Sequence, residues 1–402
     1  MTTLSFADAR HEVRKPLLRF TGLTLLGLMI PAATFSRHVF GELGSLVLAF
    51  LLLCGALAVL ARAALVHSLP RQVLRTLAAS LPILAIYAVS TAIHYEATAV
   101  TNLAQLVLVL GFMAGLTFIK WDKSDLRPLF WIFAALLVMH VAWWLAAGAP
   151  RIFHGFMGHP NGLGLFAFLL AFVPVLIVKL SRRHSLIKHV ALAAVVGSAV
   201  LLYATSSRAN WLAAVVAAFA FILWRALIAR RRWLFHLTFA LALSASIGLT
   251  WLYMIAPNYA WGWQVHELTV EYTGKNLFSG RHLFWQDLAS AIAQRPWFGY
   301  GAGAVAESFT GYAWSAHNLY MQTALQVGVV GLAALVALLW FIWSQLWRGR
   351  DTVFVQLAAA YFLGVLVHQT FEVSLTQNNL ANGFLIWLIL AVGLSHSLRH
   401  SR

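Results

Sequence analysis

The chain has 402 residues, of which 61% are hydrophobic and only 10% are charged, whereas about 25% of residues are charged in soluble domains. A soluble protein of this composition would have too few polar residues for its surface, so the composition excludes that class and indicates an integral membrane protein. The single cysteine, Cys54, excludes an intrachain disulfide. The formal net charge is +16, which raises the question of an anionic partner.

Apolar runs long enough to cross a bilayer as helices, about 17–25 residues each, recur along the whole chain. We expect helices because backbone polar groups must be paired within the hydrocarbon. No small-residue cleavage site follows the first run, so we expect it to be a span rather than a signal peptide. The sequence predicts twelve spans at 17–34, 42–61, 75–94, 98–119, 128–148, 161–179, 187–204, 209–227, 233–255, 318–346, 353–373 and 380–398.

The distribution of basic residues predicts the orientation. Twelve spans place both termini on one side, and the segments on that side carry 22 of the 28 Lys and Arg residues. The positive-inside rule therefore predicts cytoplasmic termini. The excess positive charge then reflects the topology and gives some attraction to anionic membrane lipids. It does not indicate a nucleic-acid partner. The six outer basic residues are Arg37, Arg151, Arg208, Lys275, Arg281 and Arg295.

One outer segment is much longer than the other loops. It divides the chain into spans one to nine (1–255), a loop (256–317) and spans ten to twelve (318–402), which we expect to form one membrane-embedded domain. The loop is rich in Trp, Tyr, Phe and Gly, which favours a folded segment over a disordered one. Ser279-Gly280 predicts a capped helix start, with a helix over 281–294 and a tight turn at 297–303.

Two arginines on the outer side indicate an anion site. Arg208 follows two serines at the start of the eighth span, where a guanidinium lies beside the free amides of a helix N-terminus. Arg281 lies in the first turn of the predicted loop helix, where a cation is unfavourable unless an anion is present. The alternatives are an arginine that extends to the membrane interface and a solvated arginine.

His317, in Ser-Ala-His-Asn-Leu-Tyr (315–320), lies where the loop meets the tenth span. We interpret it as a base at the membrane surface, kept neutral by the two arginines, although a histidine paired with local backbone is the alternative. Two guanidiniums and an imidazole beside hydrocarbon suit a lipid-linked phosphate or pyrophosphate. The sequence contains no P-loop and no nucleophile elbow, and its outer carboxylates are scattered, so we expect no cofactor and no metal.

At these residues the sequence resembles the bacterial O-antigen ligase and polymerase family, and its lipopolysaccharide ligases in particular. The resemblance rests on short motifs in a fixed order along the spans, and it covers essentially the whole chain. These motifs are Gly-His-Pro-Asn (158–161), the Ser-Arg-x-x-Trp turn ending at Trp211, Gly280-Arg281 with Trp285 four residues on, and Gly-x-Gly (301–303) followed by His317-Asn318.

The resemblance implies an all-α membrane glycosyltransferase (GT-C-like) fold with one large periplasmic loop, in a bacterial inner membrane. It implies transfer of an O-antigen glycan from undecaprenyl pyrophosphate to a sugar hydroxyl of lipid A–core oligosaccharide. Carried over residue by residue, His317 becomes the general base, and Arg208 and Arg281 become pyrophosphate ligands. Weaker candidates for supporting roles are Asn318, His159, Asn161, Trp211, His368 and Glu372. We expect His368 and Glu372 to lie one helical turn apart at the end of the eleventh span.

Several alternatives remain open at this stage. An O-antigen polymerase or a pilin oligosaccharyltransferase of the same family would share these motifs, although family polymerases tend to carry a second long outer loop. A secondary transporter would show paired repeats and polar sites near the midplane of the bilayer, and the two halves of this chain look dissimilar. A non-enzymatic lipid-binding role is the remaining alternative.

Overall fold

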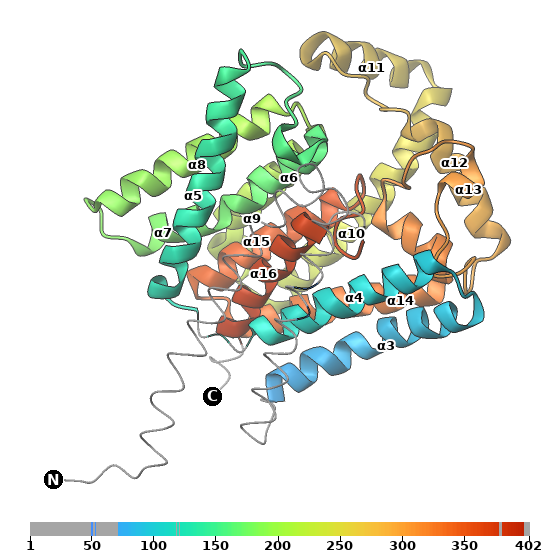
Figure 1. Ribbon diagram of the computed structural model, residues 1–402, viewed down its shortest axis with the longest axis horizontal. Coiled ribbons are helices and arrows are strands. Elements are labelled where there is room, and N and C mark those ends of the chain that lie inside the picture. Colours follow the sequence, from blue (N-terminus) through green and yellow to red (C-terminus); the bar gives the residue numbers. More distant parts are fainter. Residues whose placement is uncertain are drawn as a thin grey trace.

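The computed structural model describes Phe50, Leu53, 71–117, Ile119, 121–377 and 380–397. The predicted span at 17–34 lies outside the described residues, as does the span at 42–61 except for Phe50 and Leu53. The described part of the chain is helical and contains no strand. Figure 1 shows the arrangement of its helices.

The α-helices follow one another with short connections up to α10 and again from α14. They are α3 (Arg71–Ile93), α4 (Ala97–Leu116), α5 (Lys123–Ala146), α6 (Pro160–Leu170), α7 (Phe172–Leu180), α8 (Leu186–Ala204), α9 (Arg208–Leu223), α10 (Arg232–Ile255), α11 (Ala260–Thr273), α12 (Arg281–Gln294), α13 (Glu307–Thr310), α14 (Leu319–Leu346), α15 (Val353–His368) and α16 (Leu380–Ser397). Short 3₁₀ or π turns are η1 (Gly155–Met157), η2 (Trp224–Ile228), η3 (Ala256–Asn258) and η4 (Trp347–Gly349).

Within the described residues, nine helical segments are long and apolar enough to span a membrane, and α15 is a shorter apolar helix of 16 residues. Each predicted span from 75–94 onward coincides with one of these helices or with the continuous pair α6 and α7. The protein is therefore an all-helical, polytopic membrane protein. The span predicted at 353–373 is too long, because α15 ends at His368.

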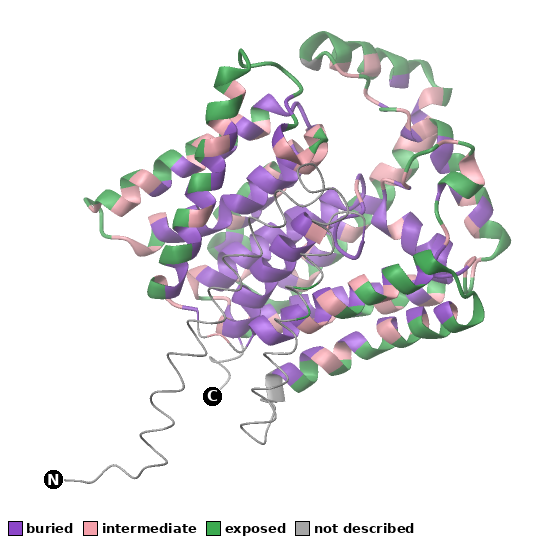
Figure 2. Cartoon of the chain, viewed as in Figure 1, coloured by how far each residue is buried: buried purple, intermediate pink, exposed green. Residues whose placement is uncertain are grey.

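The two last helices, α15 and α16, form the centre of the helical bundle. Every residue of α15 from Phe354 to His368 is buried, and α15 packs against α9, α10 and α16. Helices that are apolar on all sides belong in such an interior. The surrounding helices expose apolar side chains such as Phe219 and Ile247, which suits a lipid environment. Figure 2 shows this contrast between the buried centre and the exposed outer faces.

The long helix α14 is broken near its middle. Val327 and Gly328 have non-helical backbone angles, with φ of 68° at Gly328. The carbonyls freed by this break accept hydrogen bonds from the amides of Tyr300 (2.9 Å) and Gly301 (3.0 Å), and the Val329 amide donates to the Pro296 carbonyl (2.7 Å). The glycine-rich turn predicted at 297–303 is therefore docked into the broken helix, where its partners satisfy the exposed backbone groups.

The outer segment between α10 and α14 is largely helical. Helix α12 has the predicted bounds and packs against α10 and α14, whereas α11 extends away from the bundle (Figure 1). The predicted serine cap is wrong. Gly280 occupies the N-cap position with φ of 76°, and no side chain caps the helix. The Ser279 hydroxyl instead accepts a hydrogen bond from Arg208.

Candidate active site

A cavity of about 1020 Å³ lies where the outer segment meets the outer ends of the spans. Its polar lining comes from the start of α6, the turn before α9, the 275–281 segment and the loop before α14, and it comprises His159, Asn161, Ser206, Ser207, Arg208, Lys275, Ser279, Arg281, Ser315 and His317. The rest of the lining is largely apolar and includes Leu212, Leu249, Leu252, Trp261 and Val265. The cavity thus joins a cationic region to a surface suited to a hydrocarbon chain.

His317 lies at the rim of this cavity in an uncommon backbone conformation. Its φ is 44°, and its side chain is 28% exposed. The preceding residue is fixed by Trp285, whose Nε1 donates to the Ala316 carbonyl at 2.9 Å. Nδ1 of His317 lies 3.1 Å from Oε2 of Glu372. Because a carboxylate only accepts, the Nδ1 atom carries the proton and Nε2 of the neutral ring is the acceptor.

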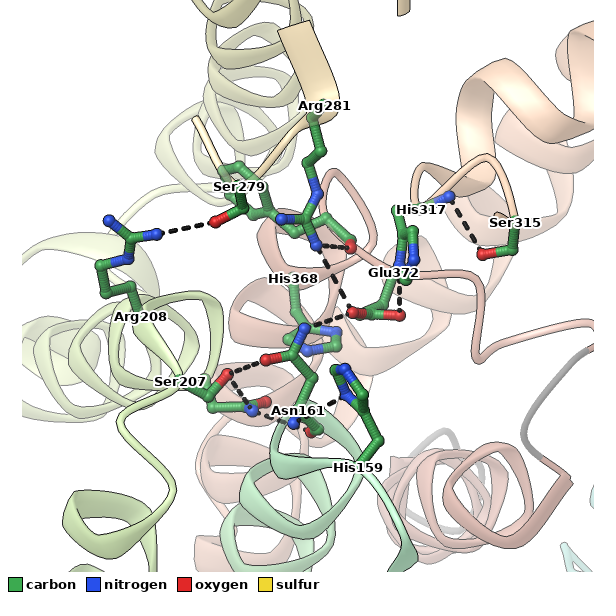
Figure 3. Close-up of polar contacts among 12 residues, drawn as sticks. His159, Asn161, Ser207, Arg208, Ser279, Arg281, Ser315, His317, His368 and Glu372 are labelled. Carbon is green, nitrogen blue, oxygen red and sulfur yellow. Dashed lines mark hydrogen bonds and ion pairs between the residues drawn. The ribbon is translucent and has the colours of Figure 1, made fainter. Parts of the chain in front are cut away.

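Glu372 joins the surrounding side chains. Its Oε1 accepts a hydrogen bond from Asn161 Nδ2 (2.6 Å) and lies 3.5 Å from Nη2 of Arg281. Burial would raise the pKa of Glu372, but the charges of His317 and Arg281 and the hydrogen bond from His317 outweigh it and lower the pKa to about 2. Glu372 is therefore a carboxylate at neutral pH. Figure 3 shows this residue between His317 and Asn161.

Arg281 lines the cavity but is buried, with only 8% of its surface exposed. Its Nη2 donates to the Phe371 carbonyl at 2.9 Å, and its guanidinium carbon lies 5.8 Å from the centre of the Phe371 ring. Its buried Nε has no hydrogen-bond partner among the described residues. The Nε–H donor of Arg281 is therefore unpaired among the described residues, and its guanidinium forms an ion pair with Glu372.

Arg208 reaches the cavity from the first residue of α9. Its Nη2 donates to the Asn276 carbonyl (2.6 Å) and to the Ser279 hydroxyl (2.8 Å), whereas its buried Nη1 has no partner among the described residues. The two arginines predicted to act together thus line one cavity. Arg208 is tied directly to the turn that leads into Arg281 (Figure 3).

The start of α6 connects the two halves of the site. Asn161 Oδ1 accepts from the Ser207 hydroxyl (2.9 Å), and Asn210 Nδ2 donates to both Ser207 (2.7 Å) and the Asn161 carbonyl (2.9 Å). His159 caps α6 through Nδ1, which accepts from the Asn161 amide at 3.2 Å. His159 is exposed to the cavity. Partial desolvation there, helped by Arg281 and Lys275, outweighs the carboxylate of Glu372 and lowers the pKa of His159, which is consistent with its acceptor role.

Strained backbone is concentrated around this cavity. Among the described non-glycine residues, five have positive φ, and four of these line it: Ile152 (66°), Ser206 (48°), Ser279 (50°) and His317 (44°). The last three carry or closely precede a predicted site residue. Such conformations cost about 1–3 kcal/mol each and tend to be found at functional sites.

Besides Glu372, which contacts lining residues, three predicted supporting residues are not part of the cavity lining. Trp211 donates from Nε1 to the Leu202 carbonyl at 2.7 Å and stacks on Tyr203, so it fastens α9 to α8. Asn318 is the N-cap of α14 and accepts from the amides of Tyr320 and Met321. Both have evident roles in holding helices.

His368 is the third, and the relation predicted for it is wrong. It is fully buried as the last residue of α15, and the chain then turns through Gln369 to Phe371 before Glu372. Gln369 Oε1 accepts from the amides of Ser374 and Leu375, which draws the chain out of the helix. His368 and Glu372 are therefore not one turn apart on a continuous helix.

Sequence reasoning missed Lys275 as a member of the site. Its Nζ donates to the Thr205 carbonyl at 3.1 Å, and the residue lines the cavity. Burial and the neighbouring Arg208 lower the pKa of Lys275. The available signal was its position among only six outer basic residues.

Comparison with known families identifies the segment that carries most of these residues. Residues 193–336 match the O-antigen ligase family. This confirms the resemblance inferred from the motifs. The matched segment contains Arg208, Lys275, Arg281 and His317, whereas Asn161 and Glu372 lie outside it. No protein of curated function matches the chain.

The match to the O-antigen ligase family supports a ligase- or polymerase-like enzyme that acts on lipid-linked polysaccharide. The cavity has the two surfaces that such a substrate requires, one cationic and one apolar. Within the part of the chain that the structure describes, no three His, Cys, Asp or Glu side chains are grouped so that they could hold a metal ion.

Proposed function

We propose that this protein is an O-antigen ligase. It transfers O-antigen polysaccharide from undecaprenyl pyrophosphate to a sugar hydroxyl of lipid A–core oligosaccharide, at the periplasmic face of a bacterial inner membrane. One observation carries the proposal: His317, Arg208 and Arg281 line the same cavity, and the rest of its lining is largely apolar. The match to the O-antigen ligase family supports the same assignment.

The donor binds through both surfaces of the cavity. Arg208 and Arg281, which both line the cavity, hold the pyrophosphate. Guanidiniums bind phosphate oxygens in pairs and remain charged at any working pH. The undecaprenyl chain runs along the apolar wall formed by residues such as Leu249 and Leu252.

His317 activates the acceptor. Its Nε2 takes the proton of the acceptor hydroxyl while the hydroxyl oxygen attacks the anomeric carbon of the donor sugar. The bond from that carbon to the pyrophosphate oxygen breaks, and its electron pair leaves with undecaprenyl pyrophosphate. A base of this kind contributes about 10²–10⁴ in rate. Attack opposite the leaving group inverts the anomeric configuration, and the guanidiniums stabilise the departing charge without a metal.

Glu372 orients the base. Its hydrogen bond with Nδ1 fixes the tautomer in which Nε2 of His317 is free to accept. The carboxylate also stabilises the imidazolium that forms when the proton moves. Asn161 and Arg281 hold Glu372 in place from two other directions.

The proposal includes the wider arrangement of the chain. We propose twelve spans with both termini in the cytoplasm, a GT-C-like fold, and the division into 1–255, 256–317 and 318–402. The nine segments suited to membrane crossing, found within the described residues, support a multi-pass protein of this kind. The cavity lies at the outer ends of α6, α9 and α10, which is the periplasmic side in this arrangement.

The test is a reconstituted ligation reaction. Purified protein is mixed with undecaprenyl-pyrophosphate-linked O-antigen and rough lipopolysaccharide in the presence of EDTA, and the product is separated on a gel. We expect a lipopolysaccharide ladder from the wild type and from His154→Ala, an exposed outer histidine that does not line the cavity. We expect no ladder from His317→Ala.

Three other outcomes would change the proposed reaction or its mechanism. Longer lipid-linked glycans without a ladder would make the protein an O-antigen polymerase. A product whose linkage retains the donor's anomeric configuration, measured by NMR, would rule out the single displacement. A requirement for divalent metal, seen as loss of the ladder with EDTA and its return with metal, would overturn the metal-independent mechanism.

A further inference from the structure

The cavity carries more positive charge than two arginines provide. Arg208, Lys275 and Arg281 line it, and Glu372 is the carboxylate that contacts the lining residues Asn161, Arg281 and His317. Three cations therefore line the cavity, one more than the two arginines assigned to the pyrophosphate. A glycan linked to a lipid through pyrophosphate carries two ionised phosphate oxygens, which a group of neighbouring cations can bind.

Lys275 and Arg208 are tied to each other's loops. Nζ of Lys275 donates to the Thr205 carbonyl (3.1 Å), three residues before Arg208, and Nη2 of Arg208 donates to the carbonyl of Asn276, the residue after Lys275. This pair of bonds holds two like charges at one side of the cavity. Like charges at a partly buried site are unfavourable unless an anion is bound between them.

We propose that Lys275 is a third ligand of the pyrophosphate and stabilises the charge that develops on the leaving group. This inference rests on the proposed ligase function, because it assigns a further residue to the same donor site. A lysine ammonium suits the role, since it binds phosphate as a compact point charge beside the planar guanidiniums.

The role of Lys275 would grow during the reaction. Cleavage of the bond between the anomeric carbon and the pyrophosphate leaves one more negative charge on undecaprenyl pyrophosphate. An ammonium beside the two guanidiniums stabilises that charge as it develops.

The experiment measures binding of undecaprenyl pyrophosphate, the leaving product, to purified full-length protein in detergent. Lys275→Gln removes the charge but keeps a hydrogen-bond donor toward Thr205, and Lys275→Arg keeps the charge. Arg295→Gln is the matched control, because it removes one positive charge from the same outer segment away from the cavity lining. Undecaprenol, which lacks phosphate, reports binding of the lipid chain alone, and the thermal unfolding midpoint checks folding.

We expect Lys275→Gln to weaken binding of undecaprenyl pyrophosphate by about tenfold or more. Lys275→Arg and Arg295→Gln should stay within about threefold of the wild type, and binding of undecaprenol should not change. In the ligation reaction, Lys275→Gln should lower both kcat and kcat/KM for the donor, because the charge it stabilises grows during bond cleavage.

Failure of the inference about Lys275 and failure of the proposed ligase function give different results. If Lys275→Gln binds undecaprenyl pyrophosphate like the wild type while Arg208→Gln does not, Lys275 only tethers the loop and the inference is wrong. The same conclusion follows if Lys275→Gln and Lys275→Arg are impaired equally, since charge would then not matter. If the wild type binds undecaprenyl pyrophosphate no better than undecaprenol, the proposed function itself fails.

Discussion

Oε2 of Glu372 lies 3.1 Å from Nδ1 of His317, although 55 residues separate the two in the chain. His317 ends the outer segment before α14, and Glu372 follows α15, the fully buried helix at the centre of the bundle. The contact therefore links the candidate base to the segment that follows the buried central helix. Because a carboxylate only accepts, it favours the tautomer with the proton on Nδ1 and leaves Nε2 as the acceptor of the neutral ring.

Replacing Glu372 with Gln should separate orientation of the base from donor binding. The amide cannot stabilise an imidazolium and offers Nδ1 a donor as readily as an acceptor, so we expect kcat to fall by about 10²-fold or more. KM for the lipid-linked donor should change little, and Glu372→Asp, which keeps the charge, should retain more activity. Steady-state ligation kinetics measure both values. A Gln variant with the wild-type kcat would show that Glu372 has no part in catalysis.

Arg208→Lys should weaken use of the donor although it conserves charge. The guanidinium lines the cavity and donates to both the Asn276 carbonyl and the Ser279 hydroxyl through Nη2. An ammonium cannot reproduce this planar arrangement, so we expect KM for the donor to rise by about tenfold. Arg151→Lys, an exposed outer arginine, is the control. Equal KM values for both variants would contradict the assigned role.

Gly164→Ala should damage the site through packing. A Cβ at Gly164 would collide with Asn210 Nδ2 and approach Thr205 Oγ1 to 2.9 Å, in the network that connects Asn161 with Ser207. Elsewhere in a helix this change is favourable by about 0.5–1 kcal/mol. We expect lower ligation activity and a lower thermal unfolding midpoint.

The matched control is Gly197→Ala in the neighbouring helix α8, where the nearest atom to the new Cβ is 3.8 Å away. This variant should keep wild-type activity and a midpoint equal to or above that of the wild type. If both alanine variants behave alike, the close contact between α6 and the turn before α9 has no functional importance.

His159 should make the fold sensitive to acid. Partial desolvation lowers its pKa below the ordinary value of 6.5, so the unfolded chain takes up a proton at a higher pH than the folded one. The stability that its neutral form contributes is therefore full above about pH 6.5 and is lost as the pH falls below it. His159→Asn keeps an acceptor for the Asn161 amide and does not titrate.

We expect the thermal unfolding midpoint, followed by tryptophan fluorescence, to fall between about pH 7.5 and 5.5, and to fall less in His159→Asn. Glu372 does not contribute to this change, because its pKa of about 2 keeps it ionised throughout the range. An identical pH dependence in both proteins would assign the effect to other groups.

Much of the fold could be predicted from local pattern. Apolar runs must be helical in hydrocarbon, so the spans from 75–94 onward were predicted correctly except at the end of 353–373. The helix at 281–294 was predictable because its apolar residues repeat with helical period and Pro296 follows its end. The predicted cap failed because Ser279 has a distant partner, Arg208, that no local pattern reveals.

The sequence by itself determined that this is a polytopic helical membrane protein and which outer residues are candidates for anion binding and acid–base chemistry. Only the tertiary structure decided how they meet: Glu372 with His317, Asn161 with Glu372, and Lys275 beside the turn before Arg208. The positions of spans and charges can be predicted from local sequence, because bilayer thickness and helical period constrain short stretches of the chain. Contacts between residues tens to hundreds of positions apart depend on how the helices pack, and for these neither spacing nor composition provides a signal.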